Sequence, residues 1–154
     1  MQINITVKGD KEVNKRLRRL GSSLLDFRVA MGTVGEEAAK YYSGKAWSSE
    51  GAAFGNPWAS LKRSTINAKL RKNRSTALSP LVGSTSGGMR DSFTHLNTRS
   101  SVVITNKKDY FKYHQSTMPR KRLPRRQMMG INDPLRRMVE RVIKQDIENK
   151  IRSA

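Results

Sequence analysis

Residues 133–151 read DPLRRMVERVIKQDIENKI and form the most regular pattern in this chain of 154 residues. Asp133 can cap a helix, and Pro134 suits the first turn because it has a fixed backbone angle and no N–H group to leave unpaired. Apolar residues then recur at helical spacing: Leu135, Val139, Val142, Ile143, Ile147 and Ile151. We therefore predict a C-terminal amphipathic helix that covers part of a small core.

Two strand-like segments, residues 89–95 and 101–105, lie before this helix and are separated by a short polar stretch. Such a pair predicts an antiparallel hairpin. Residues 2–8 alternate isoleucine or valine with polar residues, which is the period of a strand with one buried face. We expect this third segment to join the hairpin in a small sheet.

Helical spacing also appears near the N-terminus. After Asp10, which can act as a cap, the apolar positions are Val13, Leu17, Leu20 and Leu24, with most basic residues elsewhere. A second helix or a kinked continuation is predicted after Met31, weakened by Gly32 and Gly35. A short basic helix is expected within residues 59–72 and a helical turn within residues 109–115.

Three irregular segments connect these elements. Residues 48–57 and 72–88 are rich in small and polar residues, which is typical of loops. Residues 118–130 contain Pro119 and Pro124, which favour an extended path. The sequence thus predicts one α+β domain over residues 1–154: a small antiparallel sheet with a hairpin, packed against an N-terminal and a C-terminal amphipathic helix, with long loops.

The charge of the chain implies a polyanionic neighbour. There are 31 Lys and Arg residues against 12 Asp and Glu, a formal net charge of +19. The densest cluster lies in the extended segment: Arg120, Lys121, Arg122, Arg125 and Arg126. This basic arm could follow DNA phosphates, or it could be a solvated loop that meets acidic residues of a protein partner, and the sequence favours neither reading.

The sequence contains little that could support catalysis. It has no cysteine and only two histidines, His95 and His114, and it lacks the common hydrolase, metalloprotease and phosphate-binding motifs. We expect no enzymatic activity, no cofactor and no metal site, and a histidine such as His114 is more often structural. The chain also lacks a signal-peptide pattern and a long apolar stretch, which predicts assembly in the host cytoplasm without a membrane.

Four short motifs follow one another in the second half of the chain. They are GNPWASL at residues 55–61, LVG at 81–83 leading to GMRDS at 88–92, Tyr110 with His114-Gln115, and LPRRQMMG at 123–130. In this order and spacing the chain resembles the phage virion morphogenesis family, the tail-completion and neck proteins of tailed bacteriophages. Phe111 and Ser116-Thr117 depart from the family pattern, which usually has Ala and Phe-Gly there.

This resemblance implies a structural virion protein that forms a ring, six-fold symmetry being one option, at the head–tail junction or the tail end. Its partners would be other copies, other phage neck, connector and tail proteins, and packaged DNA contacted without sequence specificity. The residues that the motifs assign to assembly are Trp58, Tyr110, His114, Gln115, Pro124, Arg126 and Gly130. By itself, a tryptophan such as Trp58 more often fills a local core than an interface. The alternative function is a free-standing, sequence-nonspecific nucleic-acid-binding protein.

Overall fold

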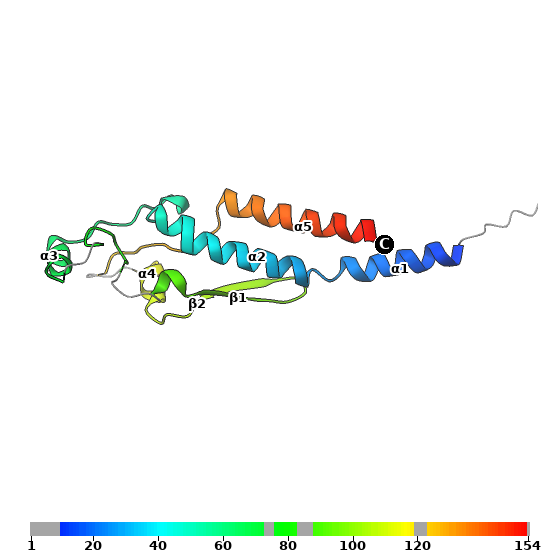
Figure 1. Cartoon of the computed structure of the whole chain (residues 1–154), viewed down its shortest axis with the longest axis horizontal. Coiled ribbons are helices and arrows are strands. Elements are labelled where there is room, and N and C mark those ends of the chain that lie inside the picture. Colours follow the sequence, from blue (N-terminus) through cyan, green and yellow to red (C-terminus); the bar gives the residue numbers. More distant parts are fainter. Residues whose placement is uncertain (1–9, 73–75, 83–87, 119–122, 154) are drawn as a thin grey trace, which may run out of the picture.

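The computed structural model describes residues 10–72, 76–82, 88–118 and 123–153 and shows an elongated molecule with α3 at one end and α1 at the other (Figure 1). Helical elements precede the hairpin: α1 Asp10–Leu24, α2 Arg28–Tyr41, the π-helical turn η1 Tyr42–Ala46, the 3-10 turns η2 Ala52–Phe54 and η3 Met89–Asp91, and α3 Arg63–Arg71. The hairpin and two helices complete the chain: β1 Phe93–Asn97, β2 Val102–Asn106, α4 Phe111–Gln115 and α5 Asp133–Ser153. The predicted α+β class is confirmed.

The hairpin is antiparallel and pairs Phe93 with Asn106 at one end and Asn97 with Val102 at the other. The first strand starts later than predicted, because Met89–Asp91 forms a 3-10 turn instead of extended backbone. Ser92 closes this turn by donating its hydroxyl to the Gly88 carbonyl at 2.8 Å. The strand predicted at residues 2–8 lies outside the described residues.

Helix α2 is the central element, since it contacts both strands of the hairpin and also α5 (Figure 1). The hairpin approaches α2 closely at Gly35, where an added Cβ would lie 2.4 Å from Cδ2 of the His95 ring. Farther along, the Asn97 side-chain amide donates to the Arg28 carbonyl at 2.9 Å. Gly35 therefore serves packing: it permits a contact that any side chain would block.

The N-terminal helix does not pack on the sheet as expected. Val13 and Leu17 of α1 are 55% and 59% exposed, and the helix extends beyond the body, while its C-terminal end contacts α5 (Figure 1). The helix that covers the hairpin is α2. Helical periodicity identifies a face that can be covered, but it does not identify which surface covers it.

The base of α1 is anchored by Lys150 of α5. The Lys150 ammonium donates to the Asp26 carbonyl at 2.5 Å, lies 4.6 Å from the centre of the Phe27 ring, and pairs with Asp146. The Phe27 N–H also donates to the Arg99 carbonyl at 2.9 Å. These contacts join the α1–α2 link to both α5 and the hairpin turn, so the point from which α1 extends is fixed to the body.

Three small clusters of buried side chains make up the core. One joins η1 to the start of α5 through Ala38, Tyr42, Ala46 and Leu135; one contains Trp47, Trp58, Met89 and Met128; and one joins α2 to α5 through Ala30, Val34 and Val142. The prediction that the C-terminal helix covers the core is therefore confirmed. No helix in the described part of the chain is both long and apolar enough to cross a membrane.

Candidate assembly site

The motif residues converge on an extended segment, residues 123–132, which we call the strap. It has no helical or strand structure and leads directly into α5, as the prolines predicted. Pro124 is half-buried within it. Arg120, Lys121 and Arg122, the first part of the basic arm, lie outside the described residues.

Arg126 fixes the middle of the strap. Its side chain is only 5% exposed, and Nε and Nη2 donate to the Ala59 carbonyl at 3.2 and 2.9 Å. Its backbone N–H donates to the His114 carbonyl at 3.0 Å. Burial lowers the pKa of the guanidinium, and the negative charge of Glu50 acts in the opposite direction. In this position Arg126 links two segments of its own chain and has little surface left for DNA, so we assign it to the protomer core.

Gln115, at the end of α4, holds the next two residues of the strap. Its Oε1 accepts the backbone N–H groups of Met128 and Met129 at 3.0 and 3.2 Å, and its Nε2 donates to the Met129 carbonyl at 2.6 Å. One amide side chain thus satisfies three backbone groups of a segment that has no sheet partner. Gln115 thereby also helps to position Met128, which is fully buried.

Trp58 lies beneath the strap and packs edge-to-face on Trp47, with ring centres 5.4 Å apart. Its indole N–H donates to the Gln127 carbonyl at 2.7 Å. The backbone turns tightly before it: Gly51 has a φ of 84°, and an added Cβ there would lie 2.4 Å from the Trp58 ring. Trp58 is therefore a core residue of this protomer, which is the commoner role for such a tryptophan.

The last part of the strap contacts η1 and η2. The Tyr42 hydroxyl donates to the Gly130 carbonyl at 3.0 Å, and burial raises the pKa of this phenol, with a further contribution from Tyr41. At Gly130 an added Cβ would lie 2.6 Å from Nε2 of Gln127 and 3.1 Å from the Phe54 ring. A side chain at Gly130 would therefore require the Gln127 amide to move and the Phe54 ring to shift slightly.

The strap ends at Asn132, a residue that the sequence motifs did not single out. Its Nδ2 donates to the Tyr41 hydroxyl at 2.8 Å and to the Ala53 carbonyl at 2.7 Å, and its Oδ1 accepts the Leu135 N–H at 3.2 Å. The last bond is an N-cap, so the cap of α5 is Asn132 and not Asp133 as predicted. The Asn-Asp-Pro sequence contained the signal, since both residues before the proline are good caps.

The predicted assembly residues therefore fall into two groups. Trp58, Gln115, Arg126 and Gly130 meet around the strap inside one protomer, and the His114 carbonyl belongs to the same network. Tyr110 is exposed instead, as are Arg125 and Ile131 within the strap. The buried group can act on assembly by shaping the protomer, whereas the exposed group can touch a neighbour.

A second polar centre organises the loop beyond α3. The Lys69 ammonium donates to the carbonyls of Thr76, Ser79 and Val82 at 3.1, 2.8 and 2.9 Å. A single cation thus satisfies backbone carbonyls in the described part of the predicted loop at residues 72–88. No grouping of three potential metal ligands occurs among the residues that the structure describes.

Comparison with known proteins agrees with the motif order. The model of a family described as the phage virion morphogenesis family matches residues 9–148. No curated protein and no solved structure matches the chain.

Proposed function

Because the chain belongs to the phage virion morphogenesis family, we propose that it is a tail-completion or neck subunit that forms a ring at the head–tail junction. Family membership itself makes the chain a virion structural or assembly protein. The proposal adds that the ring joins the tail to the DNA-filled head, with other copies and other neck, connector and tail proteins as partners.

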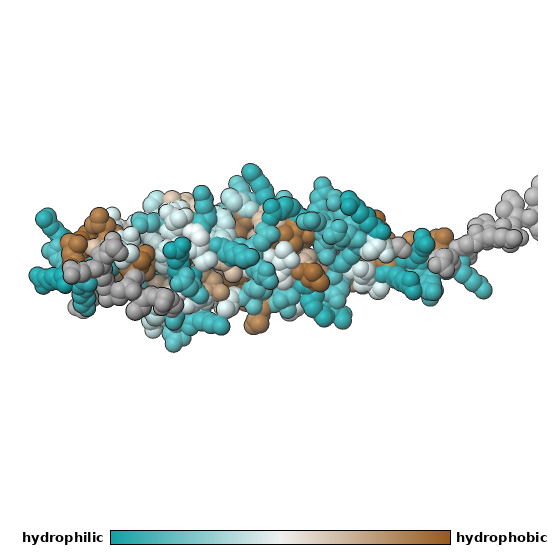
Figure 2. Space-filling view, viewed as in Figure 1, coloured by the Kyte–Doolittle hydropathy of each residue, from teal (hydrophilic) through white to brown (hydrophobic). Residues whose placement is uncertain are grey.

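The observation that carries this proposal is the balance of exposed and buried apolar side chains. Among the described residues, thirteen apolar residues are buried and thirteen large apolar side chains are exposed. The most exposed are Leu25, Val29, Leu96 and Ile131, at 77–78%. Figure 2 shows apolar side chains at the surface in several places along the long axis. Single exposed apolar residues are normal, but so many on a small elongated chain favour a subunit that is covered by neighbours.

The charge fits a ring that surrounds DNA. On α1 the exposed basic residues include Lys11, Lys15, Arg18 and Arg19, and Arg125 is exposed on the strap. With a net charge of +19, the basic residues of a free chain repel one another. The phosphates of packaged DNA would relieve this repulsion. Such contacts would be to phosphates alone, and therefore independent of sequence and sensitive to salt.

Disabling the gene in the phage that encodes this chain tests the proposal. Negative-stain microscopy of the lysate should show full heads beside unattached tails, and supplying the wild-type chain from a plasmid should restore joined particles. Normal infectious particles without the chain would overturn the proposal. Tight DNA binding by a purified monomer at physiological salt, together with normal particles, would instead establish the free-standing nucleic-acid-binding function.

A further inference from the structure

We propose that the apolar stripe of α1 in one copy docks into an apolar groove between α2, β2 and α5 of the next copy. This inference rests on the proposed ring and specifies how two of its subunits bind each other. It concerns two surfaces that the protomer leaves uncovered.

The first surface is the outer half of the α1 stripe. Leu20 and Leu24, near the base, are half-buried, whereas Val13 and Leu17 are exposed on the same side of the helix. The stripe therefore continues outward from an end that packs against α5 within the protomer. A helix with an uncovered apolar face gains stability when another surface covers it.

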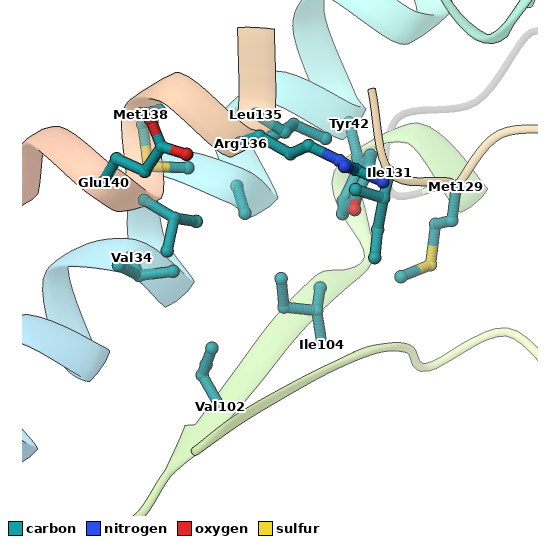
Figure 3. A pocket seen from close by; sticks show the side chains of 12 residues that line it. Val34, Tyr42, Val102, Ile104, Met129, Ile131, Leu135, Arg136, Met138 and Glu140 are labelled. Carbon is teal, nitrogen blue, oxygen red and sulfur yellow. The ribbon is translucent and has the colours of Figure 1, made fainter. Parts of the chain in front are cut away.

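The second surface is a groove of about 610 Å³ that opens between the start of α5 and the hairpin (Figure 3). Its apolar lining includes Val34, Val102, Ile104, Ile131, Met138 and Val139. Arg136 and Glu140 are the charged residues of the lining. The groove is mostly apolar and takes several aliphatic side chains, which is what two turns of an amphipathic helix present.

The protomer cannot fill this groove with its own α1. Lys150 holds the α1–α2 link at Asp26 and Phe27, and α1 runs from there away from the body (Figure 1). With a rise of about 1.5 Å per residue, Val13 lies roughly 16 Å beyond Leu24 along the helix axis. An α1 helix that enters the groove must therefore come from a second copy.

Charge favours the groove over a second α1 as the partner of the stripe. The helix carries Lys11, Lys15, Arg16, Arg18 and Arg19 against Asp10 and Glu12, so pairing two α1 helices would bring together two positive segments. The groove is neutral, with Arg136 balanced by Glu140, and Glu140 forms no ion pair within the described ranges. Arg16 flanks the stripe next to Leu17 and can meet this carboxylate.

The two surfaces are different, so each copy gives one helix and receives another. Such a head-to-tail contact closes into a ring when the rotation between copies allows it. The docked helix would keep Lys11, Lys15 and Arg18 on the side away from the groove, because they lie opposite the stripe on the helix. One contact would then both build the ring and display a basic surface toward DNA.

The absence of cysteine from the chain permits a direct cross-linking test. The double variant Leu17→Cys with Ile131→Cys places one thiol on the stripe and one at the groove, both on exposed residues. Under mild oxidation it should give a ladder of disulfide-linked oligomers on a non-reducing gel. The matched control, Lys15→Cys with Ile131→Cys, has its helix thiol on the opposite side of α1 and should give none.

A second variant, Leu17→Asp, measures whether the stripe is needed for assembly. It should remain folded by circular dichroism, because the side chain is exposed, and should lower the native mass from that of the ring to that of the monomer. If the wild-type chain forms rings and Leu17→Asp also forms rings, the docking inference is overturned and the proposed ring stands. The same holds if the wild-type chain forms rings and both cysteine pairs cross-link equally. A wild-type chain that stays monomeric at every concentration would overturn the proposed ring itself.

Discussion

Arg126→Ala should destabilise the protomer more than any neighbouring arginine substitution. The change removes two N–H groups that bind the Ala59 carbonyl at 3.2 and 2.9 Å and empties the space of a side chain that is 5% exposed. Hydrogen bonds from a charged donor contribute about 1.5–3 kcal/mol, and the backbone bond to His114 survives, so we expect a loss of about 2–3 kcal/mol. For a chain of this size that lowers the Tm by roughly 5–10 °C.

Urea unfolding followed by circular dichroism measures this loss, and Arg125→Ala is the matched control. Arg125 is exposed and makes one longer bond, from Nε to the Gln115 carbonyl at 3.3 Å, so its removal should cost under about 0.5 kcal/mol. Arg126→Lys should fall between the two, since it keeps the stem and the charge but not the paired donors. If the two alanine variants were equally stable, the account of the strap would be refuted.

Three further matched tests follow from the core. Trp58→Phe should lower the free energy of unfolding by about 1–2 kcal/mol more than Trp47→Phe. The Trp58 indole N–H binds the Gln127 carbonyl, whereas the buried Trp47 N–H has no partner within the described part of the chain. Equal losses in urea titrations of the two variants would contradict this. Gly35→Ala should lower the free energy of unfolding by about 1–3 kcal/mol, because the added methyl group overpacks against His95. The control Gly21→Ala, on exposed α1, should leave stability unchanged or raise it. If Gly35→Ala did not lower stability, the hairpin would not pack against α2 at this position. Since the pKa of Tyr42 is raised in the folded state, the unfolded chain loses this proton first and stability falls as pH rises past about 10. The stability advantage over Tyr42→Phe should therefore shrink between pH 8 and pH 10.5, and an unchanged difference would argue against a buried phenol.

The sequence was sufficient for the elements that have strong local patterns. The period of residues 133–151 predicted α5, and the two strand-like segments at residues 89–95 and 101–105 predicted the hairpin. Boundaries were less accurate where two adjacent residues could do the same task, as with Asn132 and Asp133 at the start of α5. The role of Gly35 could not be predicted, because its reason is a close contact with the distant residue His95.

In the candidate site, too, local motifs were predictable from the sequence and contacts between distant residues were not. The motif order selected Trp58, Gln115, Arg126 and Gly130, but it could not show that all four lie in the strap or bind to it inside one protomer. The Trp58 side chain and the Gln127 carbonyl are 69 residues apart in the chain, and a hydrogen bond over that separation leaves no periodic pattern. Nor did the amphipathic pattern of α1 reveal that its outer half is uncovered, since that depends on the length and direction of neighbouring elements.

Cryo-electron microscopy of the purified virion would show where this chain lies in the particle. We expect a ring of these elongated subunits at the head–tail junction, with α1 of each copy in the groove of the next and its basic side toward the DNA channel. A virion whose junction contains no copy of this chain would overturn the proposed ring.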